Sequence, residues 1–298
     1  MSLFSRFFGK KADDDTHVAS LTANPAIQSP LSLQVLFEGT LSLTSESVTE
    51  ALRAYTPSMS AAQCELDVEL SAEGKLFGIL GWGKHVIKLV GFDLPMPADA
   101  VEACVAPAHY PQVVKAKVRA HTGHLLLFYA GYETKPLEQY VALATTSGAL
   151  AKLGAIAVLN ESAHTSLPTG VLAEMGGKNA LDVLRSLPLL YLYCGFVKYE
   201  VEGTDGVWMR SYGAHLLGLP DFAALAAGHH EGEKYFEVLG NILSYLQTSG
   251  AKLAAGHTMQ IGPKEYFRVR QPSKEEYFLE SPGTLFVAEI IGPDQINR

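Results

Sequence analysis

Residues 194–222 constrain the fold more than any other stretch, because they predict two adjacent strands and the turn between them. Apolar and charged side chains alternate over residues 197–202, which is the pattern of a half-buried strand. The Gly-Thr-Asp-Gly sequence of residues 203–206 supplies a turn, and residues 207–212 return as a second strand. The result is a predicted β-hairpin whose second strand carries three notable side chains on one face: Trp208, Arg210 and Tyr212.

The loop after this hairpin concentrates residue types that bind ligands or partners. It contains His215 and ends in the Gly-Leu-Pro-Asp sequence of residues 218–221. Tryptophan, tyrosine and arginine dominate the energetics of protein interfaces, and they also bind planar or anionic ligands by stacking and bidentate hydrogen bonds. The alternative is structural, with the tryptophan packed beneath a helix and the arginine in an ion pair. The candidate binding residues are Trp208, Arg210, Tyr212, His215 and Asp221.

Elsewhere strand patterns outnumber helix patterns. Strands are expected at residues 33–37, 64–70, 74–92 (as one or two strands), 124–129, 155–159, 257–261, 266–270 and 284–291. Helices are expected after a capping box at residues 47–50, behind Pro97 and Pro136, near residues 181–184, and over residues 233–248, where the apolar stripe is strongest. Most connections look like hairpins, so the predicted fold class is α+β, with mainly antiparallel sheets and helices packed on one face. Hairpin, helix and strand follow one another in both parts of the chain, which suggests two related α/β halves.

Residues 115–121 alternate basic and apolar side chains and predict a strand that forms a hairpin with residues 124–129. The basic row of this strand consists of Lys115, Lys117, Arg119 and His121. Such a row suits an anion or an acidic partner. It also suits the solvated face of an edge strand, where lysines protect against aggregation.

The chain divides into three predicted regions. Residues 1–31 lack periodicity and are expected to be a flexible tail and linker. Within them, one short apolar group suits either a weak membrane or partner hook or a frayed terminus: Leu3, Phe4, Phe7 and Phe8. The diglycine at residues 176–177 separates an N-terminal α+β half, residues 32–177, from a C-terminal α+β half, residues 178–298.

Charge and motifs argue against several function classes. The formal net charge of −8, from 31 acidic and 23 basic residues, argues against a general nucleic-acid binder. The sequence contains no P-loop, no G-x-S-x-G elbow, no H-E-x-x-H and no C-x-x-C. His121 and His124 would hold zinc only if His109 or Glu133 came near, so neither a metal site nor a cofactor is predicted. Three widely spaced cysteines, no recognisable secretory signal and no long apolar run predict a cytoplasmic protein without stable membrane insertion.

The second strand of the hairpin and the loop after it carry a family resemblance. The pattern Gly206-x-Trp208-Met-Arg210-Ser-Tyr212-Gly213-x-His215, followed by Gly218-Leu219-Pro220-Asp221, resembles the C-terminal hallmark of the bacterial domain-of-unknown-function family 4261. The predicted helix at 233–248 and strand at 284–291 fit the same pattern, and the resemblance extends over much of residues 95–292. The short turn is also similar to one in the suppressor-of-fused-like group, some of whose bacterial members resemble toxin-immunity proteins. Family 4261 has no established catalytic residues, so the resemblance implies none here.

Two functions from different classes remain. The leading hypothesis is a non-enzymatic protein-interaction factor, such as an immunity or accessory protein that binds a bacterial toxin or a secretion-linked effector. The acidic charge suits a basic partner of this kind. The alternative is a small-molecule-binding or hydrolytic enzyme with a pocket near Arg210, Tyr212 and His215. Homo-oligomerisation stays open under either hypothesis.

Overall fold

Two sheets organise the chain, and the computed structural model describes residues 21–67 and 74–296. Contacts divide the described residues into two units, of which the first contains those up to 161 together with 166–187. The second unit contains residues 162–165 and the described residues from Pro188 onward. The apolar N-terminal group at Leu3, Phe4, Phe7 and Phe8, and residues 68–70 of the predicted strand at 64–70, lie outside the described residues.

The first sheet contains, among the described residues, seven strands in the order β2-β3-β4-β5-β1-β6-β7. They are β1 (Ser32–Phe37), β2 (Gln63–Leu66), β3 (Lys75–Trp82), β4 (His85–Phe92), β5 (Gly123–Tyr129), β6 (Ala155–Asn160) and β7 (Thr165–Pro168). The pairings of β3 with β4, β4 with β5, β5 with β1, and β1 with β6 are antiparallel. Leu33, Val35 and Leu36 are fully buried although they alternate between the two faces of β1. Both faces of this strand are therefore covered.

The helices of the first unit supply that cover. They are α2 (Ser45–Tyr55), α3 (Ala98–Val105), α4 (Gln112–Arg119), α5 (Pro136–Leu150), α6 (Thr169–Glu174) and α7 (Ala180–Ser186). α5 is buried over most of its length and contacts β1, β4, β5 and β6. Three buried hydroxyls on α5 donate to carbonyls one turn back, which satisfies them without a side-chain partner: Thr145, Thr146 and Ser147. α3 and α4 pack against β1 and β6 through an apolar cluster that includes Val118 and Leu159.

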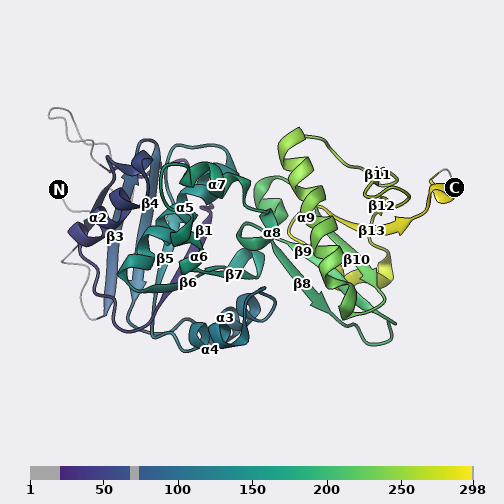
Figure 1. Cartoon of the computed structure of the whole chain (residues 1–298), viewed down its shortest axis with the longest axis horizontal. Helices are drawn as coiled ribbons and strands as arrows, with labels where there is room; N and C mark the ends of the chain where they lie inside the picture. Colours follow the sequence, from purple (N-terminus) through teal and green to yellow (C-terminus); the bar gives the residue numbers. More distant parts are fainter. Residues whose placement is uncertain (1–20, 68–73, 297–298) are drawn as a thin grey trace. The chain divides into compact units, whose positions relative to one another are not determined.

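The second sheet contains six described strands in the order β11-β12-β13-β10-β9-β8. They are β8 (Gly195–Tyr199), β9 (Val207–Tyr212), β10 (Asp221–Ala226), β11 (Thr258–Gln260), β12 (Tyr266–Arg270) and β13 (Leu285–Ile291). β8 and β9 form the predicted antiparallel hairpin, whereas β10 and β13 pair in parallel. The helices of this unit are α8 (Leu189–Leu192) and α9 (Gly232–Ser249), and α9 lies across one face of the sheet (Figure 1).

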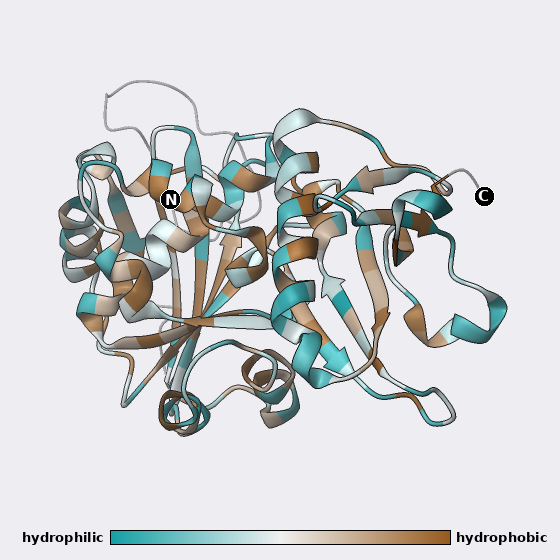
Figure 2. Cartoon of the chain, turned by 45° about the vertical axis from the view of Figure 1, so that its right-hand side comes forward, coloured by the Kyte–Doolittle hydropathy of each residue, from teal (hydrophilic) through white to brown (hydrophobic). Residues whose placement is uncertain are grey.

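The strongest predicted helix is α9, and the structure shows why it forms. Its buried side chains include Tyr235, Leu239, Ile242 and Leu246, which recur at helical spacing. Figure 2 shows apolar and polar bands alternating along this helix, as expected when one side is buried. The helix ends where Gly250 adopts a left-handed conformation with φ 67°, which glycine accepts without steric cost.

The predicted α+β fold class with mainly antiparallel sheets is confirmed. One predicted strand is wrong, because residues 115–121 belong mainly to helix α4 rather than to a hairpin. Lysine, alanine, glutamine and arginine are good helix formers and poor strand formers, and Val114 and Val118 repeat at helical spacing. Those preferences outweigh the two-residue alternation of charge. The capping box also lies three residues earlier than predicted, between Thr44 and Ser47.

Candidate functional site

The predicted binding residues meet in the second unit, where β9 lies between β8 and β10. Trp208 and Arg210 point to the same face of β9, but only 3% and 4% of their surfaces are exposed. Trp208 belongs to an apolar cluster with Ala223, Leu279 and Leu285. The structure therefore places Trp208 and Arg210 inside the packing of the unit, while Tyr212 and His215 are partly exposed.

Asp221 is the polar centre of this region. Its carboxylate is fully buried at the start of β10 and accepts hydrogen bonds from the Ser211 hydroxyl at 3.0 Å and the Ala214 amide at 3.1 Å. The Ser281 hydroxyl lies 3.5 Å from its other oxygen. Burial raises the pKa of Asp221, and these hydrogen bonds together with the nearby charge of Arg210 oppose the rise. The carboxylate thus fastens the turn between β9 and β10.

His215 lies beside this carboxylate. Its Nδ1 atom is 3.7 Å from Oδ2 of Asp221, and 21% of its side chain is exposed. A carboxylate next to a partly exposed imidazole has the composition of an acid–base pair, but this separation exceeds a hydrogen bond. A Cβ atom at position 283 would lie 2.3 Å from Cβ of His215, so this close approach requires glycine at that position.

Arg210 is held by an aromatic ring and a backbone carbonyl rather than by a carboxylate. Its Nη2 donates to the Glu280 carbonyl at 2.8 Å, and its guanidinium lies 4.7 Å from the centre of the Tyr212 ring. Tyr212 also stacks on His164, with ring centres 4.2 Å apart and planes 14° apart. Among the described residues, His164 alone of the non-glycine residues has a positive φ, 50°. Three residues of this region carry no local sequence signal and were not predicted: His164, Glu280 and Ser281.

The predicted basic row does not form one surface, because its members lie on and after a helix. Lys115 is buried and donates to the Ala106 carbonyl at 2.7 Å. Lys117 pairs with Glu38, and Arg119 forms a bidentate pair with Glu102. His121 is also buried. These side chains stabilise the first unit. They are not aligned in one row, so the structure does not support a basic surface for an anion or an acidic partner here.

The histidines that suggested zinc are bound to the backbone instead. His121 Nε2 accepts from the Met96 amide at 2.8 Å, and its Nδ1 lies 2.9 Å from the Val118 carbonyl. His124 Nδ1 lies 2.7 Å from the Leu94 carbonyl. Within the described ranges, no group of three or more metal-ligating side chains has a suitable arrangement for an ion.

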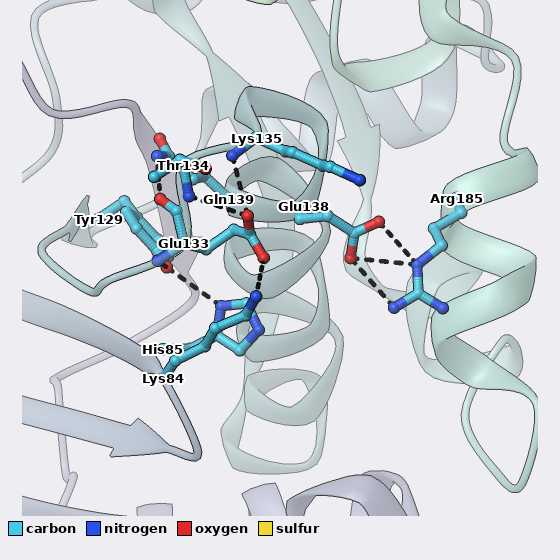
Figure 3. A network of polar contacts seen from close by, with 9 residues as sticks. All are labelled: Lys84, His85, Tyr129, Glu133, Thr134, Lys135, Glu138, Gln139 and Arg185. Atoms are coloured by element: carbon cyan, nitrogen blue, oxygen red, sulfur yellow. Dashed lines mark hydrogen bonds and ion pairs between the residues drawn. The ribbon is translucent and has the colours of Figure 1, made fainter. Parts of the chain in front are cut away.

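A second polar cluster lies in the first unit, at the start of α5 (Figure 3). Glu133 pairs with Lys84 and accepts from the amides of Thr134 and Lys135 at 2.8 and 2.9 Å. These interactions, the Lys84 bond foremost, lower the pKa of Glu133 from 4.5 to about 2. Its own amide donates to the Tyr129 hydroxyl at 3.1 Å. These contacts of Glu133 hold the chain in place immediately before α5 begins, so the cluster has a structural role.

The three cysteines are buried, and none of them forms a disulfide: Cys64, Cys104 and Cys194. Burial raises the pKa of Cys64 to about 12 and that of Cys194 well above its usual value. Neither is poised to act as a nucleophile.

A groove opens between α9 and β11, which we call the α9–β11 groove. It has a volume of about 530 Å³ and no charged residue in its lining: Val238, Asn241, Ile242, Tyr245, Thr258, Met259, Gln260 and Ile261. Tyr245 is 52% exposed. β11 ends the order of the described sheet and pairs with β12 alone. The groove therefore combines apolar side chains with a free strand edge.

Comparison with known proteins bears on this second unit. Residues 210–287 match the model of the family described as Domain of unknown function (DUF4261). The DUF4261 resemblance is confirmed. The DUF4261 match runs from Arg210 to Val287 and so contains Asp221, α9 and β11. Residues 95–209 and 288–292 of the expected span lie outside it. No curated protein and no solved structure matches the chain.

One further finding concerns membranes. In the part of the chain that the structure describes, every helix is too short or too polar to cross a bilayer.

Proposed function

We propose that this protein is a non-enzymatic protein-interaction factor that receives an extended segment of its partner in the α9–β11 groove. The supporting observation is that the outer edge of β11 pairs with no other described strand and lies beside an uncharged groove. Extended segments bind such edges by adding a strand, with main-chain hydrogen bonds for affinity and side-chain pockets for specificity.

The register of β11 identifies which backbone groups are available. Met259 lies opposite Phe267, and the Ile261 amide donates to Glu265 at 3.0 Å, so alternate residues of β11 face β12. The amides and carbonyls of Thr258 and Gln260 therefore point away from the sheet. A partner strand paired with them would direct alternate side chains towards Ile242 and Tyr245 of α9.

The uncharged lining of the groove limits which side chains the partner segment can carry. Its lining carries no charge, so the inserted residues should be apolar or uncharged, because a charge would lose its hydration without gaining an opposite charge. The net charge of −8 favours a partner that is basic overall through long-range attraction. A basic toxin or a secretion-linked effector is the partner class we propose.

Two experiments test the proposal. First, the tagged full-length protein is cross-linked in its native cell, and mass spectrometry identifies its partners. The affinity of the purified partner is then measured by titration calorimetry. Thr258→Pro removes one outward amide, and proline is tolerated at such edge positions. We expect it to weaken binding about tenfold, while Thr258→Val retains the amide and the affinity. Tyr245→Glu should also weaken binding, because it places a charge in the groove.

Tyr277→Glu is the matched control, since Tyr277 is 76% exposed in the same unit but outside the groove lining. Hydrogen exchange should show new protection at residues 258–261 in the complex. If the partner binds Thr258→Pro and Tyr245→Glu with the affinity of the wild type, the groove is not the binding site. If the captured partner is a second copy of this chain, the surface is a homodimer interface and the toxin or effector proposal fails.

A further inference from the structure

The face of β9 that carries Trp208 and Arg210 holds two buried hydrogen-bond donors that make no hydrogen bond with any described residue, and the Tyr199 hydroxyl near Arg210 makes none either. Within the described residues, neither the Trp208 Nε1 nor the Arg210 Nε donates to any atom. Both residues are more than nine-tenths buried. An unmade hydrogen bond of this kind costs about 1–3 kcal/mol, and folded proteins retain few of them. Two on one strand face indicate a site that favours an acceptor.

Both donors lie beneath the same short segment. The Phe278 ring packs edge-on against Trp208 with ring centres 5.5 Å apart, and the Glu280 carbonyl accepts from Arg210. Phe278 belongs to a 3-10 segment, Lys274–Leu279, that Arg270 holds through Glu276. The side chain of Glu280 is exposed, so solvent reaches the segment that covers the donors.

Aromatic rings frame the two donors. Tyr199 lies opposite Trp208 in the β8–β9 register, and the Tyr212 ring lies 4.7 Å from the Arg210 guanidinium. Asp221 leaves the guanidinium available, because its own hydrogen bonds go to Ser211, Ala214 and the Ser281 hydroxyl. The positive charge of Arg210 thus stands in an aromatic frame without a carboxylate hydrogen-bonded to it.

We propose that Trp208 Nε1 and Arg210 Nε bind the oxygen atoms of a carboxylate or phosphate group on a small aromatic ligand. Indole and guanidinium groups only donate, so they select an acceptor, and arginine favours planar oxyanions. Tyr212 already stacks on His164 and lies against Arg210, so the rings that a planar ligand would contact are those of Tyr199 and Trp208, against which Phe278 packs edge-on. Binding displaces the Glu280 carbonyl from Arg210 and moves the Phe278–Glu280 segment aside. This site is separate from the α9–β11 groove and needs no protein partner.

The chain contains two tryptophans, Trp82 and Trp208, which makes the test direct. The full-length protein, labelled with ¹⁵N, is titrated with benzoate and with phenyl phosphate while the two indole N–H signals are followed by NMR. We expect the Trp208 signal to shift downfield and to saturate, and the Trp82 signal to stay in place as the internal control. Whichever anion saturates at the lower concentration identifies the oxyanion. Benzyl alcohol, which has a ring and no charge, should leave both signals unchanged.

Variants then assign the affinity to the two donors. In calorimetry, Trp208→Phe retains a ring but loses the donor, and Arg210→Lys retains the charge but loses Nε; each should weaken binding about tenfold. Trp82→Phe is the matched control and should bind as the wild type does. The proposal is overturned if neither anion shifts the Trp208 signal at millimolar concentrations, if both indole signals shift alike, or if folded Trp208→Phe retains full affinity.

Discussion

His121 shows how the fold uses a side chain that has the chemistry of a metal ligand. The Met96 amide can only donate, so Nε2 of His121 must be unprotonated and Nδ1 must carry the hydrogen that reaches Val118. Burial is the main reason that the pKa of His121 lies below 6.5. The unfolded chain therefore takes up this proton more readily than the folded chain. The stabilisation is complete above pH 6.5 and decreases as the pH falls below it.

We expect His121→Asn to reduce the pH dependence of stability. In the wild type, the free energy of unfolding from urea titrations should fall between neutral pH and about pH 5, because the imidazole must gain a proton that opposes the Met96 amide. The decline should be smaller in His121→Asn. His230→Asn, at an exposed position, is the control and should follow the wild type. Parallel curves for His121→Asn and the wild type would contradict this assignment.

For Trp208 and Arg210, the sequence predicted the strand face correctly but not the burial. Alternation placed Trp208 and Arg210 on one face of a strand correctly. It could not show that both are buried, because the groups that cover them, Phe278 and Glu280, lie about seventy residues further along the chain. His164 contacts Tyr212 although 48 positions separate them in the sequence. Contacts of this range depend on the assembled fold and leave no local pattern.

At the scale of elements, α5 illustrates how a loop side chain fixes the start of a helix. Glu133 accepts from two amides that precede Pro136, and it pairs with Lys84 on the β3–β4 turn (Figure 3). A carboxylate at this end also interacts favourably with the helix dipole. Glu133→Ala should lower the free energy of unfolding by about 1–2 kcal/mol. Glu133→Gln should cost less, because its amide oxygen can still accept.

The pH dependence of this effect follows from the direction of the pKa shift. The pKa of Glu133 falls from 4.5 to about 2 on folding, so its stabilisation is complete above pH 4.5 and is lost as the pH falls towards 2. The difference between wild type and Glu133→Ala in urea titrations should therefore shrink in acid. Glu174→Ala, at the exposed end of α6, serves as the control. A difference that stays constant down to pH 2 would argue against the ionised carboxylate as the cause.

Elements with a strong apolar period were predictable, and elements defined by charge were not. α9 and the β8–β9 hairpin follow their apolar patterns closely. The strand predicted at 115–121 is wrong because its alternation came from basic side chains rather than from a repeating apolar face, and the helix buries Val118 together with Lys115. β10 was missed because Ala223, Ala224 and Ala226 give no strand signal, although all three are buried. Tertiary packing, rather than propensity, makes that segment a strand.

The division of the chain into two units predicts that the two units unfold separately rather than as one cooperative body. Residues 162–165 belong to the second unit although the chain before and after them belongs to the first. A Cβ built on Gly195 of β8 would stand 1.8 Å from the Ala163 carbonyl, so this contact tolerates only glycine. Units with separate cores open with separate free energies.

We therefore expect Gly195→Ala to destabilise the second unit by about 3 kcal/mol, because the added methyl group would collide with backbone. Hydrogen exchange should show lost protection in β9, β10 and β13, with β4 and β5 of the first unit unchanged. Gly240→Ala is the matched control: its Cβ would meet Leu190 at 3.5 Å, an ordinary contact, inside α9. Replacing a helical glycine by alanine adds up to about 1 kcal/mol of stability. If Gly195→Ala lowers protection equally in β4 and β5, the two units unfold as one cooperative body, because a defect confined to β8 would then be felt throughout the first sheet.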